Sequence, residues 1–381
     1  MGRQAGLAES RLTTDSIQRA LRRSIEEFGE VGVQVAAYLR GRLIVNTWAG
    51  LVEQGTSREV GPHTVFPIFS VSKAVTAFAV HLQVERGLID LDAPVAEYWP
   101  DYGKRGKEQL TVAHVLTHRA GVPQMPPGVT PELMSDWEWM TTRLTEVEPV
   151  HPPGTTNTYL SMTFGWLLGE VVRRTDPTRR PFAQFIHDEV AVPLNMSSFW
   201  FGVPSEESHR VATLSFPDEP PAPPEQSLAG RATPAEVALT PTAFNRKDVQ
   251  RAVIPAVGGV SSASSLARLF AALAGGGALD GVRLLSESRV RSFLAPRPDM
   301  DKHDQTYGRP MPVGAGGFWV RIPGLLPADM AVIGQTGAGC SYGWGDPEAG
   351  LAVAICHNRM AVQPPFVPLA DAIREHASEL G

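Results

Sequence analysis

The sequence predicts an α+β sandwich, in which an antiparallel β-sheet is flanked by N- and C-terminal helices and carries an inserted, mostly helical region. Two observations predict this fold class. Apolar and β-branched runs typical of strands lie near both ends of the chain, whereas the middle has the spacing of helices. The chain has 381 residues, of which 43% are hydrophobic, so it can bury a sizeable core.

The N-terminal part predicts one helix followed by two strands. The helix begins near Asp15 and ends before Gly29, because four apolar residues recur at helical spacing: Ile17, Leu21, Ile25 and Phe28. Residues 31–38 and 43–48 then have the pattern of two strands around a turn at 40–41.

The middle of the chain predicts helices and long loops. One helix is expected from about residue 70 to 86 and another from 264 to 273. Between them, residues 216–241 hold seven prolines, which exclude a helix interior or a central strand. We therefore expect an extended surface loop or lid at 216–241.

Strand patterns return in the last part of the chain, at 317–322, 330–333 and 351–357, and a helix is expected at 369–380. A sheet built from both ends makes the chain one discontinuous unit. Residues 1–69 and 300–381 are predicted to form the sheet domain. Residues 70–299 are predicted to form the mostly helical domain, with the Pro-rich loop 216–241 inside it.

Composition excludes several classes of protein. The chain has 34 Lys and Arg against 40 Asp and Glu, a net charge of −6, and no basic block, so we expect no nucleic-acid partner. Two cysteines without a CxxC give neither a disulfide framework nor a zinc ribbon. No apolar run reaches the 18 or more residues of a membrane span, and the first residues carry no secretory signal. We therefore expect no membrane association and a cytoplasmic location.

The first candidate for chemistry is the pattern Ser70-Val71-Ser72-Lys73. Residues three apart on a helix share one face, so Lys73 can approach the Ser70 hydroxyl. Serine is a weak nucleophile until a base takes its proton, and a lysine in an apolar site can do so because burial lowers its pKa. The flanking apolar runs would supply such a site. SxxK by itself also fits an N-capping serine and a surface lysine.

A rival nucleophile is Ser341, because residues 339–343 match the GxSxG elbow of α/β hydrolases. That elbow needs a strand, a sharp turn and then a helix. Here a turn and another strand follow, so we favour Ser70. His114 and His118 have i, i+4 spacing without an HExxH, so we interpret them as structural and predict no metal site.

Further stretches, taken with SxxK, resemble the serine β-lactamase and penicillin-binding-protein superfamily. Their order and spacing are family-like from about residue 31 to the C-terminus. The nearest branches are class C β-lactamases and the family VIII carboxylesterases. The stretches are Leu116-Thr117-His118-Arg119-Ala120-Gly121, Pro152-Pro153-Gly154, Tyr159-Leu160-Ser161, 164–169, 257–262, Gly334-Gln335-Thr336-Gly337-Ala338-Gly339 and 358–360.

The resemblance implies roles for individual residues. Ser70 would be the acylated nucleophile, Lys73 would help to deprotonate it, and Tyr159 would serve as general base and acid. The backbone N–H groups of Ser70 and Ala338 would form the oxyanion hole. Expected substrate-binding residues are Ser161, Gln335, Thr336, Gly337, Tyr342 and Trp344. No cofactor is implied, because these side chains supply the acid–base chemistry.

Two departures from the family pattern point to esters. The asparagine of Tyr-x-Asn is Ser161 here, and the Lys or His before Thr-Gly is Gln335, which cannot pair with a carboxylate. Both weaken binding of an amide or a β-lactam, and an ester needs less protonation of its leaving group. We therefore predict a serine hydrolase that cleaves small carboxylic esters through an acyl-enzyme on Ser70.

Three alternatives remain open. The same site can pass an acyl group to an alcohol or amine as an acyltransferase. It can hydrolyse amides or β-lactams. The fold can also serve as a non-catalytic binding module, which retention of Ser70, Lys73 and Tyr159 argues against. The expected partner is a small ester or acyl substrate, and the sequence makes no prediction of oligomeric state.

Overall fold

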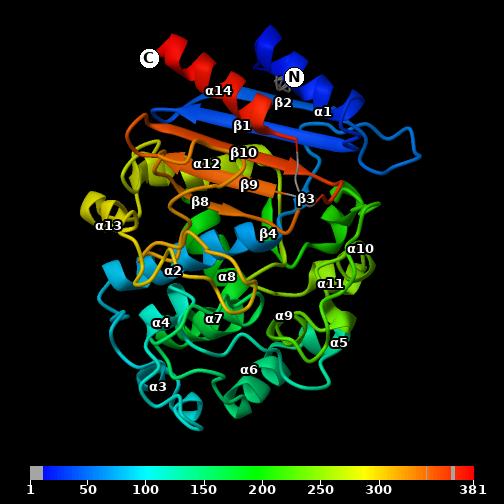
Figure 1. Ribbon diagram of the computed structural model, residues 1–381. Coiled ribbons are helices and arrows are strands. Elements are labelled where there is room, and N and C mark those ends of the chain that lie inside the picture. Colours follow the sequence, from blue (N-terminus) through cyan, green and yellow to red (C-terminus); the bar gives the residue numbers. More distant parts are fainter. Residues whose placement is uncertain (1–11, 340, 362–364) are drawn as a thin grey trace, which may run out of the picture.

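The centre of the structure is a five-stranded antiparallel sheet with the order β2-β1-β10-β9-β8 (Figure 1). The structure is a computed structural model and describes residues 12–339, 341–361 and 365–381. The strands are β1 (Gly32–Leu39), β2 (Arg42–Gly50), β8 (Ile333–Thr336), β9 (Ser341–Asp346) and β10 (Leu351–His357). Strands from both ends of the chain therefore share one sheet, which confirms the predicted fold class.

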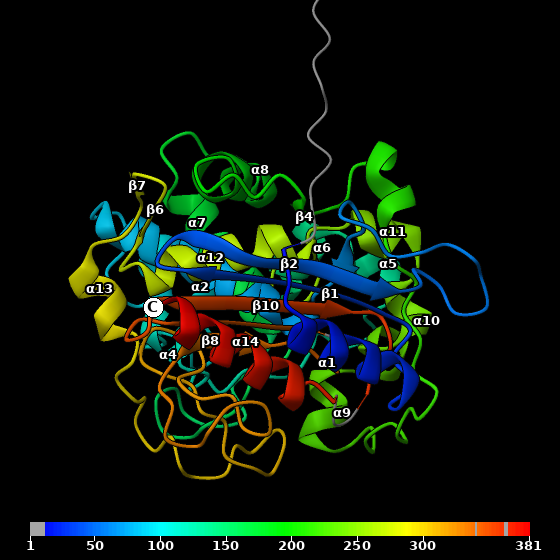
Figure 2. The same cartoon turned by 90° about the horizontal axis from the view of Figure 1, so that it is seen from above.

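Two terminal helices cover the outer face of this sheet. α1 (Asp15–Glu26) and α14 (Val367–Leu380) lie side by side across it (Figure 2). α1 begins after Thr14, whose side chain accepts a hydrogen bond from the Ile17 N–H. Ile17 and Leu21 are buried in a cluster with apolar residues of β1, β10 and α14, so burial of one apolar stripe holds the helix in place.

The inner face of the sheet packs on α12 (Ala263–Ala274), which contacts β1, β9 and β10. The Gln34 side chain in β1 accepts a hydrogen bond of 2.8 Å from the Ala263 N–H and so ties the helix start to the sheet. β9 approaches the helix closely at a glycine. A Cβ atom on Gly343 would stand 2.0 Å from the ring of Phe270. A side chain at this position would therefore separate sheet and helix.

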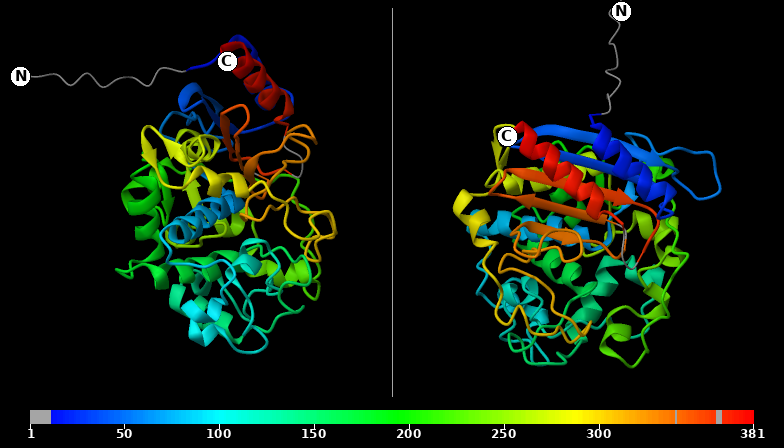
Figure 3. Two further views of the ribbon diagram at one scale, coloured as in Figure 1. Left: turned by 90° about the vertical axis from the view of Figure 1, so that its left-hand side faces the viewer. Right: turned by 45° about the horizontal axis from the view of Figure 1, so that its top comes forward.

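The helical region continues below α12, as two further views show (Figure 3). Its centre is α2 (Ser72–Glu85), whose residues 72–83 are all buried and which packs on α7 (Thr163–Thr175). One core cluster runs from the sheet into these helices. The other helices are α3 (Val95–Tyr98), α4 (Val112–Leu116), α5 (Pro131–Met134), α6 (Trp137–Glu146), α8 (Phe182–Ile186), α9 (Leu228–Ala232), α10 (Pro241–Phe244), α11 (Lys247–Arg251) and α13 (Glu287–Ser292).

Short strands connect the two regions. β3 (Phe66–Pro67), β4 (Phe199–Phe201) and β5 (Gly259–Ser261) form a three-stranded sheet with β5 in the middle. β6 (Ala278–Leu279) and β7 (Val282–Arg283) form a hairpin. The predicted helical domain, 70–299, contains α12, which packs on the sheet and joins both regions in one core.

The C-terminal strands differ from the prediction in position. Residues 317–322 form isolated bridges from Trp319 to Val313 and to Gly334 in place of the expected strand, and the strand expected at 330–333 starts at Ile333. The sequence predicts a turn after residue 343, because glycine is depleted in ordinary strands, but β9 continues to Asp346. Its glycines are required here by the contact with α12, which no local pattern reveals.

We expect Gly343→Ala to destabilise the protein by about 1–3 kcal/mol, because the added methyl group overpacks the interface with Phe270. Urea unfolding followed by circular dichroism measures the change as a lower midpoint. Gly61→Ala is the control, since its Cβ atom would meet nothing within 4 Å. Equal midpoints for the two variants would contradict the close contact between β9 and α12.

Candidate active site

Ser70 and Lys73 meet at the start of α2, as the SxxK spacing predicts. The Lys73 Nζ lies 3.0 Å from the Ser70 Oγ. Its other hydrogen-bond partners are two backbone carbonyls, of Ser161 at 2.7 Å and of Ala256 at 3.2 Å. Lys73 is fully buried, and burial lowers its pKa well below the ordinary value of lysine. The amine form is therefore favoured next to the serine.

The turn that presents Ser70 is strained and firmly held. Phe69 precedes the serine in the short helix η1 (Phe69–Val71) and has a φ of +42°, in the left-handed region that non-glycine residues avoid. Such a conformation costs about 1–3 kcal/mol and persists only where the surroundings impose it. The Ile68 N–H donates to the Gly259 carbonyl, and the ring of Phe69 packs on Phe244 with centroids 4.8 Å apart. These contacts fix the direction of the Ser70 side chain.

Tyr159 stands against the same hydroxyl. Its phenol lies near enough to the Ser70 side chain for the two to interact, and its ring stacks on His118 with centroids 4.2 Å apart. Burial raises the pKa of Tyr159, so the phenol stays protonated. The His118 Nδ1 accepts a hydrogen bond from the Leu160 N–H, and burial lowers the pKa of His118 well below its ordinary value. A neutral, structural histidine therefore supports the ring of Tyr159.

A cavity of about 310 Å³ lies next to these groups, and most of the predicted site residues line it. It is lined by Ser70, Tyr159, Ser161, Thr336, Gly337, Ala338 and Tyr342 of that set. Ala338, one of the two predicted oxyanion donors, therefore lies in the same cavity as Ser70. Lys73 sits behind Ser70, fully enclosed. The structure thus gathers residues from the two ends and the middle of the chain at one place.

Gln335 and Trp344 do not line this cavity. Gln335 pairs with Gly343 across the sheet and is fully buried, so it faces the same inner side as Gly343. Trp344 lies two residues further along β9 than Tyr342 and is buried among apolar residues such as Ile322 and Leu326. The structure therefore does not bring these two side chains to the cavity surface with the other predicted residues. Each is fully buried next to a residue that lines the cavity.

Several cavity residues lie outside the sequence motifs. They are Leu239, Tyr307, Arg309, Met311, Trp319, Pro323 and Ala361. Most come from the loop before β8, whose path depends on tertiary contacts. Asp304 is fully buried there and accepts hydrogen bonds from the N–H groups of Thr306 and Tyr307. The buried Asp304 carboxylate is the feature that positions this loop, and a single sequence does not reveal that this aspartate is buried.

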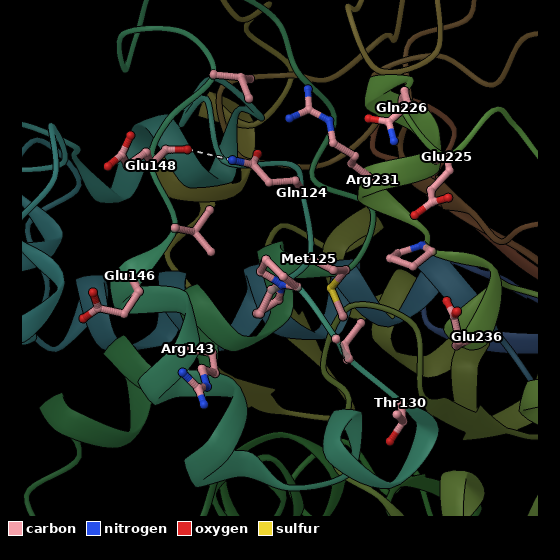
Figure 4. Close-up of a pocket in the computed structure, with 18 of the residues that line it drawn as sticks. Gln124, Met125, Thr130, Arg143, Glu146, Glu148, Glu225, Gln226, Arg231 and Glu236 are labelled. Atoms are coloured by element: carbon pink, nitrogen blue, oxygen red, sulfur yellow. Dashed lines mark hydrogen bonds between the residues drawn. The ribbon is translucent and has the colours of Figure 1, made fainter.

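A second, larger cavity of about 1140 Å³ is lined by residues between 124 and 150 and by part of the Pro-rich segment (Figure 4). Its lining includes Gln124, Met125, Arg231 and Glu236, but none of Ser70, Lys73 or Tyr159. Glu236 and Leu239 line different cavities although they are three positions apart in the chain, at most about 11 Å. The segment 216–241 therefore contributes to the wall between the two cavities. It is not an extended loop throughout, because it contains α9 and the short helix η5 (Ala235–Val237).

The rival nucleophile does not fit its motif. Ser341 is fully buried at the start of β9 and follows β8, so a strand stands where the elbow needs a helix. Residue 340 of that motif lies outside the described residues. Within the described residues, no group of His, Cys, Asp and Glu could hold a metal ion. No helix among them is long and apolar enough to cross a membrane.

A serine hydroxyl in contact with a buried amine and a phenol is the arrangement of a serine hydrolase, and fold and site together define that class. Known proteins agree. The family model described as Beta-lactamase matches residues 19–378. The esterase/beta-lactamase LipL of Mycobacterium tuberculosis is 31% identical over 368 residues, which cover 91% of this chain and 83% of that protein.

Two solved structures extend the similarity to three dimensions. A family VIII carboxylesterase has a TM-score of 0.85 at 27% identity, over 94% of this chain and 96% of that one. A penicillin-binding protein homologue from Caulobacter crescentus has a TM-score of 0.86 at 28% identity, over 96% of this chain and 99% of that one. The chain therefore belongs to the beta-lactamase family.

We expect the free energy of unfolding to depend on pH because the pKa of Lys73 is lowered in the folded protein. Between its folded and unfolded pKa values, the unfolded chain binds one more proton, so the free energy of unfolding rises with pH. The wild type should therefore gain stability relative to Lys73→Met as pH is raised from 7 towards 10, by up to about 1.4 kcal/mol per pH unit. Urea unfolding of both proteins at several pH values measures the difference.

Lys302→Met, which removes an exposed lysine, is the control for the loss of one positive charge. A difference between wild type and Lys73→Met that stays constant from pH 7 to 10 would mean that Lys73 is not held as the amine over this range.

Proposed function

We propose that this protein hydrolyses carboxylic esters of small molecules through an acyl-enzyme on Ser70. The observation that carries the proposal is the set of partners around Lys73. An amine has two N–H groups and one lone pair. With both N–H groups donating to the carbonyls of Ser161 and Ala256, the lone pair is left for the Ser70 hydroxyl. Lys73 then acts as the general base.

Tyr159 supplies the acid in this proposal. Because its pKa is raised by burial, it carries a proton that it can give to the leaving alcohol. Ser70 attacks the ester carbonyl and loses its proton to Lys73, the C–O bond to the alcohol breaks, and the alcohol leaves with the proton of Tyr159. The proton then returns from Lys73 to Tyr159. Water attacks the acyl carbonyl and gives a proton to Lys73, the bond between the acyl carbon and the Ser70 Oγ breaks, Ser70 takes a proton from Tyr159, and the carboxylic acid leaves. A second proton return from Lys73 to Tyr159 restores the resting state.

The oxyanion of this reaction is assigned to the backbone N–H groups of Ser70 and Ala338. Both residues line the catalytic cavity, and Gly337 brings the strand close to the nucleophile turn, since its Cβ atom would stand 2.5 Å from the Ile68 carbonyl oxygen. Preorganised donors of this kind contribute about 10²–10³-fold in rate where one has been removed.

Esters are favoured over amides for two reasons. An alkoxide leaves with less help from a proton donor than an amine does, and this site holds one phenol for that task. The short hydroxyl of Ser161 already bonds Tyr307 at 2.6 Å, so it offers little to a substrate amide. The names of LipL, an esterase/beta-lactamase, and of the similar carboxylesterase support the same class of substrate.

Ser70→Ala should abolish the burst of p-nitrophenol from p-nitrophenyl acetate and lower turnover by at least about 10³-fold, because the nucleophile is lost. Intact-mass spectrometry should find an acetyl adduct on the wild type and none on Ser70→Ala. Ser341→Ala is the matched control and should keep the adduct, since Ser341 is fully buried in a strand and does not line the cavity. Full esterase activity in Ser70→Ala would refute the assignment of the nucleophile.

Tyr159→Phe should lower kcat/KM by about 10²–10⁴-fold while the stacking on His118 keeps the fold intact. The loss should be larger for ethyl acetate than for p-nitrophenyl acetate, because a poor leaving group depends more on the acid. Steady-state kinetics on both esters measures this contrast. The same loss for both esters would argue against proton donation by Tyr159.

A further inference from the structure

We propose that Tyr307 determines specificity for the alcohol half of the ester, where its ring favours a flat aromatic group. The inference rests on the proposed function. Tyr307 lines the catalytic cavity with Ser70 and Tyr159, and 40% of it is exposed. Its ring lies 5.8 Å from that of Tyr159, centroid to centroid. A large ring at the entrance to the reacting groups is therefore open to substrate.

The ring is held in position from both ends. The Tyr307 Oη lies 2.6 Å from the Ser161 Oγ, and its N–H donates to the buried Asp304 carboxylate at 3.3 Å. The neighbouring residues clamp the loop onto the Tyr159 segment. The Thr306 hydroxyl donates to the Tyr159 carbonyl at 3.2 Å, and the Gln305 N–H donates to the Asn157 carbonyl at 2.8 Å. A ring fixed before binding loses little entropy when a ligand stacks on it.

The position next to Tyr159 assigns the ring to the alcohol. In the proposed reaction the leaving oxygen must face the phenol that protonates it, so the alcohol extends to the Tyr159 side of Ser70. Tyr307 stands on that side. The same loop and its continuation add Arg309, Met311, Trp319 and Pro323 to the cavity wall. The last three are apolar surfaces that suit a planar group more than a long polar one.

The substitution at position 161 makes room for this contact. Ser161 has a short side chain, and the phenol of Tyr307 fills the space above it. In a pair of hydroxyl groups one donates to the other, which leaves one O–H free to donate. Where the family pattern has an asparagine amide, this chain therefore presents the ring of Tyr307 and one hydroxyl that can donate a hydrogen bond.

Two acetate esters test the inference with the acyl group and the leaving-group basicity kept nearly constant. Benzyl acetate carries a flat alcohol, and cyclohexylmethyl acetate carries a puckered one with the same number of heavy atoms. We expect wild type to prefer benzyl acetate in kcat/KM, measured by acetate release. Tyr307→Ala should lower this preference by about two- to tenfold, the range that one aromatic contact supplies. Tyr307→Phe should keep the preference, because it keeps the ring.

A second comparison varies the acyl half of the ester and keeps the alcohol constant. The ratio of kcat/KM for p-nitrophenyl butyrate over acetate should be the same in wild type and Tyr307→Ala. Tyr98→Ala removes a tyrosine outside the cavity and should change neither ratio. An unchanged benzyl preference in Tyr307→Ala, or a change confined to the butyrate ratio, would overturn the inference. The acetyl adduct on Ser70 in the same variant distinguishes that outcome from failure of the proposed function.

Discussion

The enclosure of the Lys73 amine is the constraint on which the rest of the structure depends. An ammonium ion would lose its hydration in this position, so the site works only if the surroundings keep water out and favour the neutral form. Three segments far apart in the chain meet at the amine: the start of α2, the turn before α7 at Ser161, and the turn before β5 at Ala256. The packing of α2 with α7 and with the segment before β5 must therefore be complete before the amine is enclosed.

The site also costs stability, and the fold compensates for it. A buried lysine without a carboxylate partner among the described residues and a left-handed Phe69 both oppose folding. They persist because their neighbours are fixed independently. β5 holds Ile68 and Ser72 by hydrogen bonds through Gly259, and Phe244 packs on Phe69. Strain of this kind at the nucleophile is typical of sites that hold a reactive group in one orientation.

The sequence predicts what is local and misses what depends on tertiary packing. Helical spacing places Ser70 and Lys73 together, and the motif stretches bring Tyr159 and Ala338 to the same cavity. β9 is missed because Gly343 is selected by the ring of Phe270, which lies far away in the chain. Tyr307 is missed because its loop is positioned by the buried Asp304, and nothing in the sequence marks that carboxylate as buried.

The two departures at positions 161 and 335 act together. Gln335 is neutral and is fully buried outside the cavity lining, and the Ser161 hydroxyl is hydrogen-bonded to Tyr307. Burial lowers the pKa of Lys73 and raises that of Tyr159, so both reacting partners of Ser70 are neutral in their favoured forms. Neutral groups can bind a neutral ester without any charge being removed from water, and removing a charge from water is costly in an enclosed site. At the reacting centre, selection then depends on shape and ring contacts, because Lys73 and Tyr159 carry no charge in their favoured forms; the charge in the cavity lining is that of Arg309.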